Sequence, residues 1–136
     1  MKVTKIQERY YHHQRCVIRL KDAINRDLTD DIVLTAVIKT YEMTIELGWK
    51  VIRDFLQYQG IDSPLRGSRD VIRSAFKAYI YIDAPLWLKM VDERNKIVHE
   101  YDEEHSRMLA NRIKEIYLAE FENAAAIMKK LLDELE

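Results

Sequence analysis

The sequence predicts an all-α protein that folds as an antiparallel up-and-down bundle of four to five helices in one domain spanning residues 1–136. Glycine and proline are scarce, at three and two residues of 136, which favours long helices joined by short connections. Apolar residues recur at helical spacing along several segments. The one strand-like run, residues 78–82, has no second strand to pair with.

The expected helices follow one another with local start signals. They cover residues 3–27, 31–59, 69–81, 85–98 and 103–135. Thr29 or Asp30 is expected to cap the second helix, Ser68 the third and Asp83 the fourth. Short polar side chains at these positions can satisfy the free backbone N–H groups of a first helical turn. The sequence therefore predicts where three of the five helices begin.

Two glycines predict local features of the second helix. Gly60 is expected to end the second helix in a left-handed conformation, which glycine adopts without strain. Gly48 lies inside the same helix, where glycine costs about 1 kcal/mol relative to alanine. We therefore expect another element to pack closely against Gly48.

Charge and composition narrow the classes of function. The net charge of −1 combines a basic segment 1–28 with an acidic segment 100–136, a pattern that favours protein partners or a local phosphate site over general coating of nucleic acid. The single cysteine, Cys16, cannot form an internal disulfide. Charged residues interrupt every apolar run, so we expect no signal peptide, no membrane segment and a cytoplasmic location.

The residues best suited to chemistry lie in the segment 94–101, RNKIVHEY. The guanidinium of Arg94 can grip a phosphate, and the imidazole of His99 can transfer a proton near neutral pH. Together they could cleave RNA without a metal: His99 would take the proton of a 2′-hydroxyl or give one to the leaving 5′-oxygen. Arg94 would stabilise the charge that builds on the scissile phosphate.

The spacing of Arg94 and His99 sets a geometric condition on this hypothesis. On an uninterrupted helix, residues five apart point about 140° from each other and lie about 7.5 Å apart along the axis. Either the helix ends near Val98 so that His99 turns back, or two copies bring their motifs together across a two-fold axis. A structural interpretation is also open, because cations suit the C-terminal end of a helix dipole.

A second group of candidates is basic and consists of Arg66, Arg69, Arg73 and Lys77. The last three are spaced four apart and so share one helix face. They could follow an RNA backbone or bind a nucleotide phosphate, and the alternative is a solvated helix surface.

Metal and cofactor chemistry is not expected. His99, Asp102 and His105 offer three ligand types within a short stretch, but their spacing matches no usual zinc arrangement. The sequence contains neither a phosphate-cradling glycine loop nor the Gly-Ser and paired-Asp motif of a nucleotidyltransferase. We therefore expect no metal, no cofactor and no nucleotide transfer by the chain itself.

Three segments together resemble the nucleotidyltransferase substrate-binding protein family, a branch of the HEPN superfamily. The segments are YEMTIELGWK at 41–50, SRDVIRSAF at 68–76 and WLKMVDERNKIVHEYD at 87–102. Their order and spacing are far more specific than Arg-x4-His alone. The resemblance implies a HEPN-like bundle that forms a homodimer, in which the Arg-x4-His motifs of two subunits meet.

The resemblance also implies a function and its control. The chain would be a metal-independent endoribonuclease, the toxin of a toxin–antitoxin pair, with Arg94, Asn95 and His99 as its catalytic residues. Its partner would be a small separate nucleotidyltransferase, the antitoxin, which silences the toxin by adding AMP to the tyrosine of Arg-x4-His-x-Tyr. Tyr101 occupies that tyrosine position.

Two other functions stay open. An older interpretation of the family is a non-catalytic subunit that binds a nucleotide or other substrate for a two-component nucleotidyltransferase. The third possibility is a purely structural dimer module, in which Arg94 ties down the dimer through a carboxylate such as Asp92 or Asp102.

Overall fold

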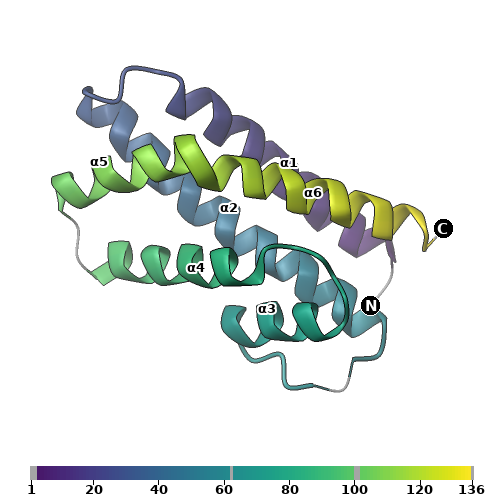
Figure 1. The fold of residues 1–136 in the computed structure, drawn as a ribbon. Coiled ribbons are helices and arrows are strands. Elements are labelled where there is room, and N and C mark those ends of the chain that lie inside the picture. The colour runs from purple at the N-terminus through teal and green to yellow at the C-terminus, as the bar shows by residue number, and fades with distance from the viewer. Residues whose placement is uncertain (1–2, 62, 100–101, 136) are drawn as a thin grey trace.

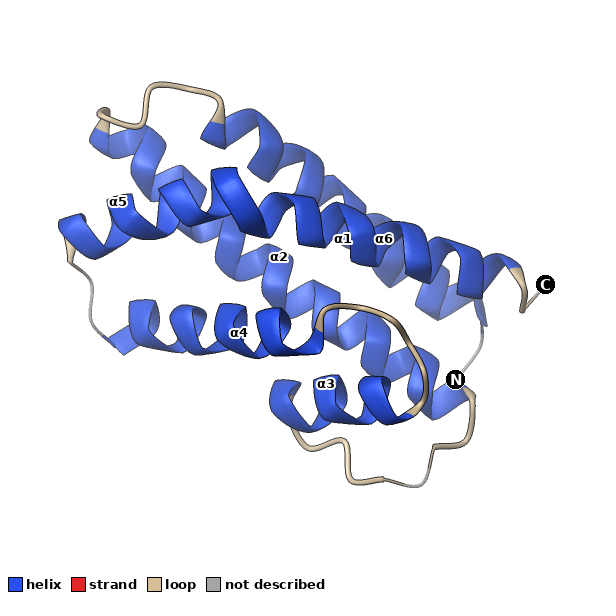
Figure 2. Ribbon diagram, viewed as in Figure 1, coloured by secondary structure: helices blue, strands red, loops and turns tan. Residues whose placement is uncertain are grey.

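The structure, a computed structural model, describes residues 3–61, 63–99 and 102–135, with the side chains of Val98 and His99 outside the described part. Helices account for all regular structure in these residues, which confirms the predicted all-α fold (Figure 2). The helical elements are α1 (Val3–Ile24), α2 (Asp31–Tyr58), α3 (Ser68–Lys77), α4 (Ala84–His99), α5 (Glu103–Arg112), η1 (Ile113–Tyr117) and α6 (Leu118–Asp133).

The long helices run antiparallel to their neighbours in the chain, as predicted (Figure 1). Helix α1 packs along α2, and the continuous run of α5, η1 and α6 lies across both. Helix α4 lies beside this run and against α2, and the short α3 packs under α4 and α2. No helix of the described residues is both long enough and apolar enough to cross a lipid bilayer.

Local capping signals predicted two helix starts and one helix end. The Asp30 carboxylate accepts hydrogen bonds from the backbone N–H groups of Ile32, at 2.8 Å, and Val33, at 3.4 Å. Asp83 accepts one from the N–H of Leu86 at 3.1 Å. Gly60 has the expected left-handed backbone, with φ of 76°. These interactions need only residues within one turn of each other, so they could be predicted from the sequence.

The prediction for the third helix was wrong at both ends. Ser68 is its first helical residue, and Gly67 holds the N-cap position without a side-chain hydrogen bond. The helix ends at Lys77, not at residue 81, and Tyr79 follows with a left-handed φ of 62°. This turn lets Ile80 and Ile82, both about 5% exposed, reach the core. Burial of these two side chains therefore outweighs the strain of a left-handed tyrosine.

The expected helix 103–135 is interrupted by the π-helical turn η1. Such a turn inserts an extra residue and so rotates the second part of a helix relative to the first. Ile113 and Tyr117, at its two ends, are both fully buried. The π turn thus keeps the apolar side of α5 and the apolar side of α6 on the same core.

The packing at Gly48 confirms the expected close contact. A Cβ atom at this position would lie 2.8 Å from Cη2 of Trp87 and 2.9 Å from Nε2 of His13. The indole of Trp87 meets Phe121 edge-on, with ring centroids 5.6 Å apart, and its Nε1 donates a 2.9 Å hydrogen bond to Glu120. Glycine at position 48 therefore lets α1, α2, α4 and α6 meet at one point.

His13 makes stability depend on pH. Burial lowers the pKa of its imidazole from 6.5 to about 4, and a hydrogen bond with the Thr44 backbone offsets part of the shift. Between about pH 6.5 and pH 4 the His13 imidazole binds a proton in the unfolded chain but not in the folded protein. The free energy of unfolding therefore decreases as the pH is lowered through this range. We expect His13 to lower the free energy of unfolding by about 2 kcal/mol between pH 8 and pH 5.

Urea unfolding of wild type and His13→Gln at both pH values measures this effect. The variant should lose markedly less stability between pH 8 and pH 5 than wild type does. His12→Gln is the matched control, because His12 is exposed on the same helix, and it should retain the wild-type pH dependence. Equal pH dependence in all three proteins would contradict the assignment to His13.

Candidate active site and the pocket between α4 and α5

Two buried hydrogen bonds hold the helix that carries the Arg-x4-His segment. The hydroxyl of Tyr41 in α2 donates to the backbone oxygen of Met90 at 2.6 Å. Trp87, one turn earlier in α4, is tied to Glu120 of α6. Because the anchors lie on different neighbours, α4 is fixed both in position and in rotation about its axis. Arg94, one turn beyond Met90, therefore faces α2.

Arg94 is held by a carboxylate on α2. Its Nη2 lies 3.3 Å from Oε1 of Glu46, and both side chains are about one-third exposed. The other oxygen of Glu46 accepts a 2.6 Å hydrogen bond from the indole N–H of Trp49. Arg94 Nε is buried and has no hydrogen-bond partner among the described residues. Glu46 thus orients the guanidinium while leaving several of its N–H groups available.

Within one subunit Arg94 pairs with Glu46 and not with Asp92 or Asp102, and a tie across a dimer stays a prediction. Asp92 pairs with Arg69 of α3 instead. Asp102 caps α5 by accepting a hydrogen bond from the N–H of Glu104 at 3.1 Å. Distance along the sequence could not identify the partner of Arg94, because Glu46 lies 48 positions away from it.

The remaining residues of the candidate active site follow Arg94 along the chain. Asn95 is exposed, and its side-chain oxygen accepts a 3.2 Å hydrogen bond from Arg94. Helix α4 spans Ala84–His99, so its end agrees with the expectation near Val98, and the turn of His99 back toward Arg94 stays a prediction. The side chain of His99 and all of Tyr101 lie outside the described residues. The two-copy arrangement of the motif stays a prediction.

The four basic candidates divide into two groups. Arg66, Arg73 and Lys77 line one surface hollow, together with the carboxylate of Asp70. Arg69 is absent from that lining and forms its ion pair with Asp92. Three of the four predicted cations are therefore brought together, and the fourth links α3 to α4.

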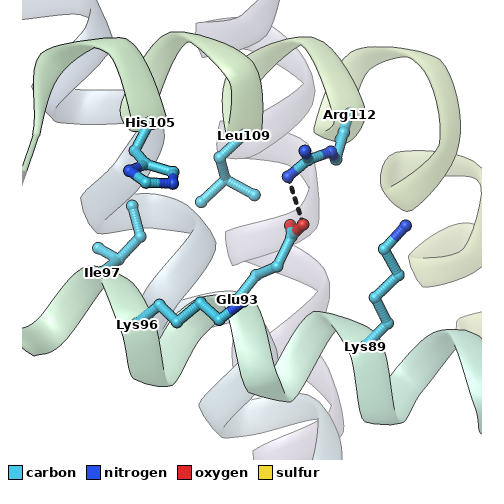
Figure 3. Close-up of a pocket in the computed structure, with 7 residues that line it drawn as sticks. All are labelled: Lys89, Glu93, Lys96, Ile97, His105, Leu109 and Arg112. Atoms are coloured by element: carbon cyan, nitrogen blue, oxygen red, sulfur yellow. Dashed lines mark hydrogen bonds and ion pairs between the residues drawn. The ribbon is translucent and has the colours of Figure 1, made fainter. Parts of the chain in front are cut away.

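A pocket between α4 and α5 was not predicted from the sequence. It has a volume of about 280 Å³ and is lined by Lys89, Glu93, Lys96 and Ile97 from α4 and by His105, Leu109 and Arg112 from α5. Figure 3 shows these side chains entering the space from the two facing helices. The spacing of the α4 residues shows from the sequence that they share one face of a helix. Which α5 residues lie opposite them depends on how the two helices pack, and this could not be predicted.

The inner wall of the pocket is a buried polar cluster. Glu93 forms an ion pair with Arg112 (Figure 3). Burial, and then the Glu93 carboxylate, raise the pKa of the Tyr117 hydroxyl. The same two causes, in the same order, raise the pKa of Tyr41 well above its ordinary value. Both phenols therefore stay neutral at physiological pH, and the Arg112 guanidinium balances the Glu93 charge.

Potential metal ligands are dispersed in the part of the chain that the structure describes. Among those residues, no group of three or more His, Cys, Asp or Glu side chains could hold a metal ion. The trio of His99, Asp102 and His105 includes one side chain, that of His99, which lies outside the described part.

The ion pair of Arg94 is too exposed to contribute much stability. Exposed pairs contribute roughly 0–1 kcal/mol, so Arg94→Ala should lower the free energy of unfolding by less than about 1 kcal/mol. Arg9→Ala is the contrasting variant, because its 2.8 Å ion pair is with Asp54, a side chain only 1% exposed. Losing a hydrogen bond to a buried charge should cost about 1.5–3 kcal/mol.

Chemical denaturation of the two variants and wild type makes this comparison. A loss for Arg94→Ala as large as that for Arg9→Ala would favour the purely structural role for Arg94.

Comparison with known proteins places the chain among helical proteins of related architecture. The family model "Nucleotidyltransferase substrate binding protein like" matches residues 8–130. The "Probable ribonuclease HepT" of Haemophilus influenzae is 26% identical over 102 residues, which cover 70% of each chain.

Two solved structures share the fold. The tri-AMPylated Shewanella oneidensis HEPN toxin in complex with MNT antitoxin is 20% identical, with a TM-score of 0.79 over 96% of this chain and 98% of that one. A Haemophilus influenzae protein, whose structure is described as revealing the fold of a substrate binding domain of a nucleotidyltransferase, is 21% identical. It has a TM-score of 0.67 over 94% of this chain and 99% of its own. Because the family model covers nearly the whole chain, the protein belongs to the nucleotidyltransferase substrate binding protein like family.

Proposed function

We propose that this protein is a metal-independent endoribonuclease of the HEPN toxin type, active as a homodimer. The observation that carries the proposal is the orientation of Arg94. This residue lies on α4, the helix that includes His99, and its guanidinium is held by Glu46 of α2. The relative from Haemophilus influenzae is named as a probable ribonuclease, and the Shewanella oneidensis structure is of a HEPN toxin. Both names support the same class of activity.

In the proposed reaction the 2′-oxygen of one nucleotide attacks the adjacent phosphorus atom. The bond from phosphorus to the 5′-oxygen breaks, which leaves a 2′,3′-cyclic phosphate and a 5′-hydroxyl. His99 removes the 2′-hydroxyl proton or supplies the proton to the leaving oxygen. Arg94 balances the charge that develops on the phosphate oxygens, and Asn95 keeps the guanidinium in place through its side-chain oxygen. Pairing two motifs across a two-fold axis would overcome the divergence of about 140° along one helix.

Cleavage of RNA tests the proposal directly. Purified wild type, incubated with total RNA or tRNA in excess chelator, should produce fragments. Arg94→Ala and His99→Ala should each lower the rate at least about 100-fold, the typical contribution of a positioned acid–base group or charge stabiliser.

Two variants of exposed α1 residues serve as controls. Arg19→Ala and His12→Ala remove the same side-chain types away from α4, and both should cleave at the wild-type rate. If wild type and His99→Ala leave RNA equally intact, the enzymatic function is wrong.

A small separate nucleotidyltransferase is the proposed antitoxin, and it would silence the protein by adding AMP to Tyr101. The support comes from the Shewanella oneidensis toxin, which was solved in tri-AMPylated form with its MNT antitoxin. Incubation with ATP and the cognate transferase should add the mass of one or more AMP groups, measured by intact-protein mass spectrometry. Tyr101→Phe should abolish the gain, while Tyr79→Phe, an exposed tyrosine on another segment, should keep it. An unchanged gain in Tyr101→Phe would move the modification to another residue.

The second candidate function is a non-catalytic nucleotide-binding subunit of a two-component nucleotidyltransferase. The pocket between α4 and α5 favours it, because its cationic lining suits a phosphate whether or not RNA is cut. In that case nucleotide or partner binding would survive His99→Ala, and wild type would show no cleavage. The activity assay therefore separates the two functions.

A further inference from the structure

We propose that the pocket between α4 and α5 is a binding site for one nucleoside phosphate, supplied either by an RNA strand or as a free nucleotide. The RNA source rests on the proposed function, whereas the free nucleotide does not. Three features of the pocket support the site: cations that would hold the phosphate, a surface that would hold the sugar or base, and a position beside the Arg-x4-His segment.

The cations of the pocket outnumber the carboxylate that could neutralise them. Lys89, Lys96 and Arg112 line it together with one carboxylate, that of Glu93. Within the described residues, Glu93 pairs with Arg112, and neither lysine has an ion pair or hydrogen bond. Arg112 uses Nη1 for this pair, so other N–H groups of its guanidinium remain available. The two lysine charges, unpaired among the described residues, can bind the dianionic phosphate of a free nucleotide or the monoanionic phosphodiester of an RNA strand.

The other lining residues suit a sugar or base. Ile97 and Leu109 form an apolar wall from opposite helices (Figure 3), and both belong to the packed core. The Glu93 carboxylate can accept a hydrogen bond from a ribose hydroxyl or a base amino group. A volume of about 280 Å³ lies near the lower end of small-molecule sites, about 300–1,000 Å³. The pocket therefore has room for one nucleotide.

The pocket adjoins the candidate active site along the chain. Lys96 and Ile97 are lining residues and also members of the segment that begins at Arg94. His105, on the opposite wall, follows the end of α4 by six positions and lies 3.6 Å from Asp102. Arg94 itself faces α2, so an RNA strand that occupied both the pocket and the Arg94 guanidinium would pass across α4. In an RNA strand, the pocket would hold a nucleotide other than the one whose phosphate Arg94 is proposed to bind.

The test measures binding without cleavage. Isothermal titration with AMP, and with a short 2′-O-methyl RNA that lacks the attacking hydroxyl, gives the two affinities for wild type and for Lys89→Gln/Lys96→Gln. Loss of two phosphate contacts should weaken binding by about tenfold or more and make it less dependent on salt. Lys5→Gln/Lys130→Gln is the matched control: it changes the charge equally, and both lysines are exposed near the ends of α1 and α6. It should bind as wild type does.

Backbone amide NMR gives a second measurement that does not depend on a variant. Titration of wild type with AMP should shift the signals of Ile97, Leu109 and Arg112 before those of α1. Weaker binding of both ligands by the double variant supports the site for either source, and weaker binding of RNA alone assigns it to an RNA nucleotide. Unchanged affinity for both ligands, or shifts confined to other helices, would overturn the site even if wild type cleaves RNA. If wild type binds AMP here but leaves RNA intact, the site stands and the proposed ribonuclease fails.

Discussion

Trp87 determines where α4 lies, and every functional feature of the molecule depends on that placement. Its indole occupies the space that a side chain at Gly48 would fill, packs edge-on against Phe121 and donates its N–H to Glu120. The contact uses α2 and α6 together, so α4 cannot move away from one without losing the other. Since protein interiors are packed as densely as organic crystals, this leaves α4 a single position. The Tyr41 hydrogen bond to Met90 then fixes its rotation.

With its rotation fixed, α4 presents a different carboxylate or cation to each neighbour. Arg94 meets Glu46 of α2, Asp92 meets Arg69 of α3, and Glu93 meets Arg112 of α5. Each pair neutralises a charge and ties α4 to a different element. Lys89 and Lys96 have no such partner within the described residues, so positive potential remains on the α5 side of the helix. The charge available for a phosphate is therefore set by which cations find a carboxylate in the folded protein.

The buried cluster behind Glu93 explains why a carboxylate is tolerated beside a cationic pocket. Tyr41 and Tyr117 stack with ring centroids 6.1 Å apart, and both lie near Glu93, which raises the pKa of each phenol. A buried carboxylate needs a cation or hydrogen-bond donors to offset its loss of hydration. Arg112 supplies the cation, and it is the last residue of α5 before the π turn. The π turn thus has a role beyond packing, because it lies where Arg112 and Tyr117 both reach Glu93.

Local sequence determined the helical class, the caps at Asp30 and Asp83, the left-handed Gly60 and the segment that contains Arg94. Each of these follows from residues within a few positions of one another, whose interactions are the same in any helical protein. Tertiary structure alone decided the left-handed Tyr79, the π turn at Ile113–Tyr117, the Glu46 partner of Arg94 and the pocket between α4 and α5. These features arise from contacts between residues far apart in the chain, and they depend on which helix faces meet when the core closes around Trp87.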